Sequence, residues 1–90
     1  MRADVWLWRA RFCKTRSLAA RLLDGGKVRL ARAGQETRLD KAARTVKVGD
    51  GLVFAIAGRL HAVRIEALGV RRGPPAEARA LYSPLDETAP

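Results

Sequence analysis

The sequence has 90 residues, of which 48% are hydrophobic and 30% are charged, and it carries a formal net charge of +9. This length fits one domain with a thin core, and so apolar a composition excludes a disordered basic tail. Residues 1–49 contain 13 basic and 4 acidic residues, whereas residues 50–90 contain 5 of each. The whole imbalance lies in the first half, as expected of a face that binds a polyanion.

Other classes of protein are excluded by local features. No apolar run approaches the roughly 20 residues that a membrane span requires, so we expect no membrane partner. Met1 leads directly into charged residues, which predicts no secretory signal. Cys13 is the only cysteine, which excludes an internal disulfide and a multi-cysteine zinc site. We therefore expect a cytoplasmic protein.

Two helices are predicted at the start of the chain. The first covers about residues 3–12, with Asp4 near its start, where a carboxylate suits the helix dipole. The second begins near Thr15 or Ser17, either of which can act as N-cap, and ends at Gly25-Gly26. The spacing predicts that one polar face of this helix aligns three side chains: Lys14, Ser17 and Arg21.

The pattern then changes to strands. Residues 27–32 alternate basic and apolar side chains, which predicts a strand with its cations facing outward. The remaining predicted elements are a loop with a partial strand (33–44), a short strand (46–48), two strands joined at Gly58-Arg59 (52–57 and 60–68) and a short helix (76–82). The predicted class is α+β, with the two N-terminal helices packed on a small antiparallel sheet of four or five strands and a short C-terminal helix.

The helix–turn–helix form of residues 3–24 is compatible with two kinds of nucleic-acid binding. A helix that enters the major groove of DNA offers Asn, Gln or Arg to the bases. Residues 3–24 contain no Asn or Gln, and their polar side offers cations and hydroxyls instead. These groups suit phosphate and sugar, which favours structured RNA, and the positive N-terminus of the second helix favours a bound phosphate.

Four motifs in this order resemble the S4-type RNA-binding domain, the alpha-L motif of a small-subunit ribosomal protein: Arg2-Ala3-Asp4 with Trp6-Leu7, Lys14-Thr15-Arg16-Ser17-Leu18-Ala19, Gly26-Lys27-Val28 and Val48-Gly49-Asp50. A narrower resemblance, to the family of the bacterial fifteen-kilodalton heat-shock protein and related small ribosome-associated quality-control proteins, covers nearly the whole chain. It rests on Trp6-Leu7-Trp8, Arg11-Phe12, Gly25-Gly26-Lys27-Val28 and Arg71-Arg72 with Pro75, Glu77-Ala78 and Leu81-Tyr82.

The resemblance implies one S4-type domain over residues 1–90, with its core at 2–57, a hairpin and short helix at 58–82 and a polar tail at 83–90. It also implies a noncatalytic protein that binds structured rRNA and tRNA on the large ribosomal subunit, in rescue or quality control of stalled translation. No pair of side chains supplies a nucleophile with its base, so we expect no enzyme activity, cofactor, metal or small-molecule substrate. Away from the ribosome we expect a monomer.

The family pattern assigns RNA contact to seven residues: Arg2, Lys14, Thr15, Arg16, Ser17, Arg21 and Lys27. Three further RNA contacts, Arg9, Arg11 and Arg29, are predicted only from their charge and from the face on which they are expected to lie. Arg71 and Arg72 form either a solvated pair or a second RNA contact. The sequence departs from the family at Val5, where a lysine is common, and at 33–44, where relatives turn at once through Asn-Gly.

Three alternatives remain open. The first is an RNA-targeting module that works with a separate RNA-modifying enzyme. The second is a DNA-binding helix–turn–helix protein, and the third is a protein-interaction module with incidental charge. Competition by duplex DNA would identify the second, and binding that barely responds to salt would identify the third.

Overall fold

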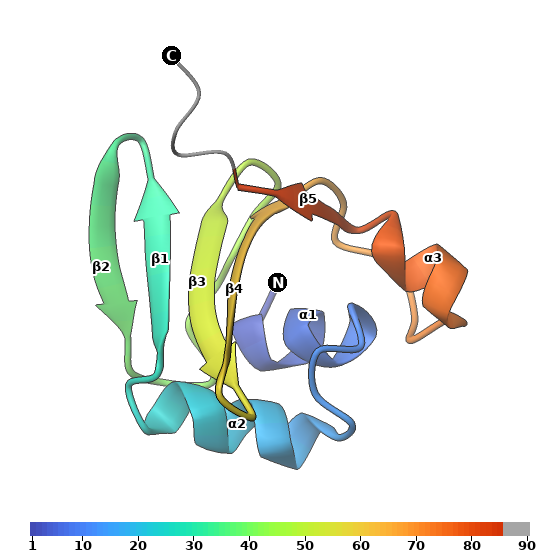
Figure 1. The fold of residues 1–90 in the computed structure, drawn as a ribbon, viewed down its shortest axis with the longest axis horizontal. Coiled ribbons are helices and arrows are strands. Elements are labelled where there is room, and N and C mark those ends of the chain that lie inside the picture. The colour runs from blue at the N-terminus through green and yellow to red at the C-terminus, as the bar shows by residue number, and fades with distance from the viewer. Residues whose placement is uncertain (86–90) are drawn as a thin grey trace.

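Two N-terminal helices, α1 (Ala3–Arg9) and α2 (Arg16–Asp24), pack against each other and beside an antiparallel sheet (Figure 1). The computed structural model describes residues 1–85. The sheet has five strands in the order β2-β1-β3-β4-β5, and α2 runs across one end of the strands. The strands are β1 (Val28–Arg32), β2 (Gln35–Leu39), β3 (Gly51–Ile56), β4 (Arg59–Ile65) and β5 (Tyr82–Pro84), and a short helix, α3 (Pro75–Arg79), precedes β5. The predicted α+β class is confirmed.

Helix α2 begins and ends as the sequence predicts. The Thr15 side chain is the N-cap, and its Oγ1 accepts a hydrogen bond from the backbone N–H of Leu18 at 3.0 Å. At the other end, Gly26 has a φ of +70°, and the N–H of Lys27 donates to the carbonyl of Leu22 at 3.2 Å. This is a Schellman motif, which glycine adopts without strain. The helix therefore leads directly into β1.

Helix α1 is shorter than predicted, because it ends at Arg9 rather than near residue 12. Arg11 has a φ of +65°, and the N–H of Phe12 donates to the carbonyl of Leu7 at 3.1 Å. The same kind of turn thus ends both helices, but in α1 an arginine occupies the left-handed position. That turn directs the partly buried Phe12 against the edge of the core, where its ring packs against those of Phe54 and Tyr82 at centroid distances of 5.0 and 4.7 Å.

The segment between β1 and β3 differs from the prediction at two points. Residues 33–34 form a tight turn, with φ values of +52° and +78°, so β2 pairs with β1 along its whole length. Residues 46–48 do not form the predicted strand. This stretch passes the N-terminus instead, where the N–H of Val46 donates to the carbonyl of Met1 at 2.8 Å and Thr45 forms an isolated bridge with Arg2.

The second half also departs from its predicted boundaries. Strand β4 ends at Ile65 rather than at 68, because the N–H groups of Glu66 and Ala67 both donate to the carbonyl of Leu81. Helix α3 starts at Pro75 and ends at Arg79, earlier than the predicted 76–82. Strand β5 was not predicted and includes the first residues of the expected polar tail at 83–90, of which 86–90 lie outside the described residues.

The core lies between the two N-terminal helices and the sheet. Trp6 is fully buried, as predicted, and its Nε1 donates to the carbonyl of Ala67 at 3.0 Å. Trp8 is half-buried, and Cys13 is buried, which raises the pKa of its thiol. No helix within residues 1–85 has both the length and the apolar character that a membrane crossing requires. The largest fully buried side chains are those of Trp6, Phe54, Leu7, Leu23, Leu39, Leu52, Ile65 and Val28.

Candidate nucleic-acid interface

Helix α2 presents a row of exposed cations. Its N-cap hydroxyl is engaged with the backbone, whereas the side chains around it are open to solvent. The helix packs through Ala19 and Leu23, so its opposite side faces outward, as the sequence predicts. Within residues 1–85 none of these cations lies in an ion pair with a carboxylate. The exposed polar residues of this row are Lys14, Arg16, Ser17, Arg21 and, after the helix, Lys27.

The row continues onto the outer face of the sheet. Arg29 on β1 lies directly opposite Arg38 on β2, and together with Lys27 they line a shallow groove. The side chain of Arg38 lies close to Gly26, where an added Cβ would be 3.1 Å from Cδ of Arg38. We name the set of Lys14, Arg16, Arg21, Lys27, Arg29 and Arg38 the α2–β1 basic surface. It consists of six exposed cations, four on α2, β1 and β2 and two just before α2 and β1.

Arg38 is the member that the sequence analysis missed. Like charges directly opposite each other destabilise a sheet, and only Arg29 is compensated, by Glu36 at 3.1 Å. The arrangement therefore favours the binding of an anion next to the guanidinium of Arg38. The alternation in β2 could have revealed it, but only after the turn at residues 33–34 had fixed the register with β1.

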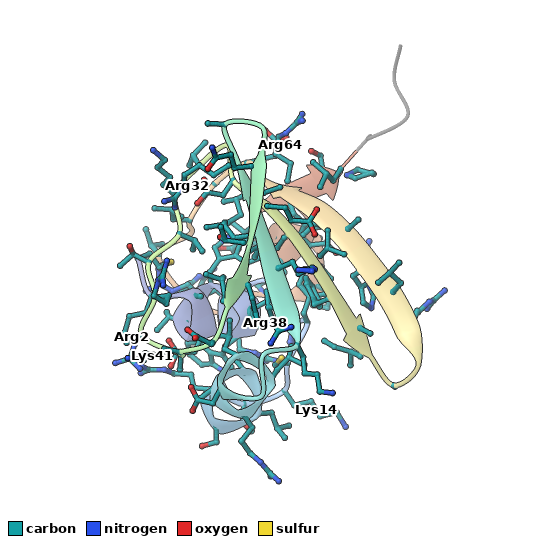
Figure 2. The ribbon with its side chains drawn as sticks, turned by 90° about the vertical axis from the view of Figure 1, so that its left-hand side faces the viewer. Arg2, Lys14, Arg32, Arg38, Lys41 and Arg64 are labelled. Atoms are coloured by element: carbon teal, nitrogen blue, oxygen red, sulfur yellow. The ribbon has the colours of Figure 1, made fainter. Side chains whose placement is uncertain are left out.

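Arg2 lies apart from Lys14, on the other side of the same face (Figure 2). Its guanidinium makes two hydrogen bonds to the buried carboxylate of Asp4, at 3.1 and 3.0 Å. Its neighbours are the residues that follow β2, since the N–H of Ala3 donates to the carbonyl of Arg44. Figure 2 places Lys41 beside Arg2 and Arg38 between this pair and Lys14. Lys41 and Arg44 are two further cations that the sequence analysis did not select.

Two of the other candidate arginines, Arg9 and Arg72, form contacts between α1 and the second half of the protein. Nη1 of Arg9 donates to the carbonyl of Gly69 at 2.8 Å, and Nε of Arg72 donates to the carbonyl of Trp8 at 3.1 Å. Arg11 is half-buried, and its Nε, like that of Arg9, has no partner within residues 1–85. Arg71 is exposed and pairs with Glu77 at 2.9 Å. Unlike the cations of the α2–β1 basic surface apart from Arg29, these four are either half-buried or paired with a carboxylate.

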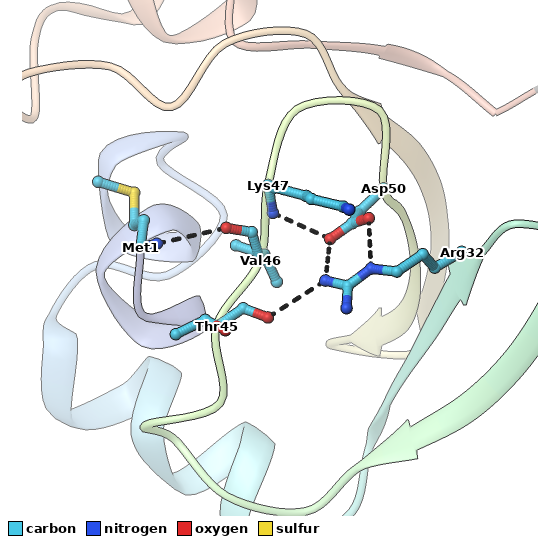
Figure 3. Close-up of polar contacts among 6 residues, drawn as sticks. All are labelled: Met1, Arg32, Thr45, Val46, Lys47 and Asp50. Atoms are coloured by element: carbon cyan, nitrogen blue, oxygen red, sulfur yellow. Dashed lines mark hydrogen bonds and ion pairs between the residues drawn. The ribbon is translucent and has the colours of Figure 1, made fainter.

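In the Val48-Gly49-Asp50 motif only Asp50 is buried, and its carboxylate faces the guanidinium of Arg32 (Figure 3). Asp50 is buried and accepts two hydrogen bonds from Arg32, at 2.9 and 2.7 Å, and one from the N–H of Lys47 at 2.9 Å. Burial raises the pKa of Asp50, but these hydrogen bonds and the nearby positive charges outweigh it, so the pKa is lowered. The guanidinium of Arg32 also reaches the carbonyl of Thr45 at 3.5 Å. Arg32 is therefore a structural cation that ties β1 to the segment before β3.

The described residues offer no arrangement for a metal, since within 1–85 no three His, Cys, Asp or Glu side chains come together. What this interface offers chemically is positive charge, hydroxyls and backbone N–H groups. Those are the groups that recognise phosphate and sugar.

Comparisons with known proteins identify the family of this chain. Residues 1–34 match the S4 domain family. Heat shock protein 15 of Escherichia coli strain K12 is 37% identical over 89 residues, which cover 99% of this chain and 61% of that protein. The Haemophilus influenzae homolog is 36% identical over 89 residues, covering 98% and 63%. This chain thus spans less than two thirds of the length of these relatives.

A solved structure also shows similarity to heat shock protein 15. The trimeric structure of Vibrio cholerae heat shock protein 15 matches this fold with a TM-score of 0.83 at 34% identity. The match covers 98% of this chain and 84% of that one, so it includes the sheet and α3 as well as the two N-terminal helices.

Proposed function

This chain belongs to the heat shock protein 15 family and carries an S4 RNA-binding domain, and we propose that it binds structured rRNA and tRNA on the large ribosomal subunit. There it would act in the rescue or quality control of stalled translation, as a noncatalytic protein of the cytoplasm. The observation that carries this proposal is the α2–β1 basic surface, whose cations are exposed and, apart from Arg29, unpaired within residues 1–85.

The chemistry of the surface suits an RNA backbone. Lys and Arg side chains release condensed counterions when they meet phosphates, which supplies affinity without base contacts. The N-terminus of α2 adds a second attraction. The N–H of Leu18 is capped by Thr15, but those of Arg16 and Ser17 lie in the first turn, where no carbonyl of the helix can accept them. These N–H groups and the helix dipole favour a phosphate next to Arg16.

Salt dependence tests the proposed contact with RNA. If the surface engages about 4–6 phosphates, a plot of log affinity against log salt should have a slope of roughly −4 to −5. The measurement is a fluorescence titration of a large-subunit rRNA fragment at several salt concentrations. A slope near zero would identify a protein-interaction module instead. Displacement of the rRNA by duplex DNA at equal nucleotide concentration would identify a DNA-binding protein.

Crosslinking in cells, followed by sequencing of the attached RNA, tests the ribosomal role. We expect enrichment of large-subunit rRNA and tRNA. Recovery dominated by messenger RNA would overturn the ribosomal assignment while leaving RNA binding intact.

The oligomeric state is a separate part of the proposal. The Vibrio cholerae relative was solved as a trimer. For this chain we propose a monomer away from the ribosome, because its net charge of +9 opposes the association of copies. Sedimentation at low and high salt measures this directly, and a stable trimer at low salt would contradict it.

A further inference from the structure

A groove of about 610 Å³ lies between α2 and the turn that joins β3 to β4. Figure 1 shows this turn reaching α2. The lining is largely apolar, and Leu18 is 45% exposed although it lies on a strongly basic helix. Small side chains at 55 and 57 leave the mouth open on the strand side. The larger apolar residues of the lining are Phe12, Leu18, Leu22 and Ile56.

Two cations border this apolar groove. Lys14 precedes α2 and Arg21 lies in the last turn of α2, and both line the groove and are exposed. Neither is paired with a carboxylate anywhere in the part of the chain that the structure describes. A ligand that fits must combine a flat apolar portion with an adjacent negative charge. A nucleotide has this construction, with an apolar base face next to an anionic phosphate.

We propose that the groove takes one unpaired nucleotide of the bound RNA, an inference that rests on the function proposed above. The base would lie against Leu18 and Phe12, and its phosphate would lie between Lys14 and Arg21. Phe12 suits this role because the rings of Phe54 and Tyr82 already fix its position. A base inside a continuous duplex cannot reach the groove, whereas bulges and loops present bases that can be splayed out. The groove would therefore direct the α2–β1 basic surface to irregular RNA.

Two RNA hairpins of equal stem length test this inference, one fully paired and one with a single unpaired adenosine. Fluorescence anisotropy at fixed salt gives both dissociation constants. We expect the wild type to bind the bulged hairpin about tenfold more tightly, near the lower part of the range for a base that stacks on a protein. With 2-aminopurine at the unpaired position, binding should increase the fluorescence, because the base leaves its stacked neighbours.

The variant Leu18→Arg separates charge from apolar contact. It adds a cation to the surface, so simple electrostatics predicts tighter binding of both hairpins. We expect instead that the preference for the bulge disappears, while affinity for the paired hairpin is retained or rises. Val70→Arg makes the same change at a side chain that is 85% exposed and lies outside the groove. This control should keep the preference.

The outcomes distinguish the inference from the proposed function. Equal binding of both hairpins by the wild type, with a steep salt dependence, overturns the groove inference and leaves RNA binding intact. A preference for the bulged hairpin that survives Leu18→Arg also overturns the groove inference. So does self-association of the wild type in sedimentation that Leu18→Arg abolishes, because a second copy of the chain would then occupy the groove. Failure to bind either hairpin overturns the proposed function and the groove inference together.

Discussion

The cations of the α2–β1 basic surface contrast with the arginines that are held by other parts of the protein. Arg21 and Lys27 are exposed and have no carboxylate partner within residues 1–85. In contrast, Arg32 donates to the buried carboxylate of Asp50, and Arg72 donates to the backbone carbonyl of Trp8. The comparison shows that formal charge and available charge differ in this molecule, because some arginines serve the fold and others remain free for a polyanion.

The largest expected effect is a loss of stability when the ion pair between Arg32 and Asp50 is broken. Asp50→Asn keeps the shape of the side chain but removes the charge that holds the guanidinium of Arg32. Hydrogen bonds to charged groups contribute about 1.5–3 kcal/mol, so we expect the free energy of unfolding to fall by about 2 kcal/mol. Urea denaturation measures this loss. The salt slope of RNA binding should not change, and a steeper slope would indicate that the released Arg32 contacts RNA.

The same ion pair predicts how stability depends on pH. The pKa of Asp50 is lowered in the folded protein, so the unfolded chain binds its proton more tightly. The stabilisation is therefore present above the unfolded pKa of about 3.9 and is lost as pH falls through the lower folded pKa. We expect the difference in unfolding free energy between wild type and Asp50→Asn to shrink below about pH 4. A difference that stays constant down to pH 2 would contradict this assignment.

Two exposed arginines give the matching test on the binding side. Arg21 is unpaired within residues 1–85, whereas Arg71 pairs with Glu77 at 2.9 Å. Arg21→Gln should weaken binding of an rRNA fragment and reduce the salt slope by about one, because one phosphate contact is lost. Arg71→Gln removes the same charge and should leave the slope unchanged. A loss of slope in Arg71→Gln would establish a second RNA contact at Arg71-Arg72.

Much of the fold could be predicted from the sequence because its signals are local. The Thr15 cap and the glycines at 25–26 define α2, and residues 27–32 alternate as a strand. Two predicted boundaries were wrong at residues other than glycine with a positive φ: α1 ends before Arg11, and β3 ends before Ala57, so that the hairpin turn lies at residues 57–58. Such residues carry no sequence signal for a turn, and tertiary contacts impose the conformation. Strand β5 has only three residues, too few for a periodic pattern.

The candidate site was predictable to the extent that it follows one continuous segment. Residues 14–29 contribute five of its six cations, and the facing of α2 follows from helical spacing. Arg9 and Arg11 have the same charge, but the chain reverses after α1 and leaves both half-buried. Arg38 could not be selected, because only the register between β1 and β2 brings it opposite Arg29. Whether each selected residue contacts RNA stays a prediction.

Replacement of Arg38 has the smallest expected effect on the free energy of unfolding, and the sign of this effect is informative. Arg38→Gln should reduce the salt slope of RNA binding by about one, because it removes a cation from the α2–β1 basic surface. The same change removes the repulsion across the strands with Arg29, so the free energy of unfolding should rise by a few tenths of a kcal/mol. A cation that serves only the fold would show the opposite combination, a loss of stability with unchanged binding. Urea denaturation and the salt titration of one variant therefore decide to which side of the comparison Arg38 belongs.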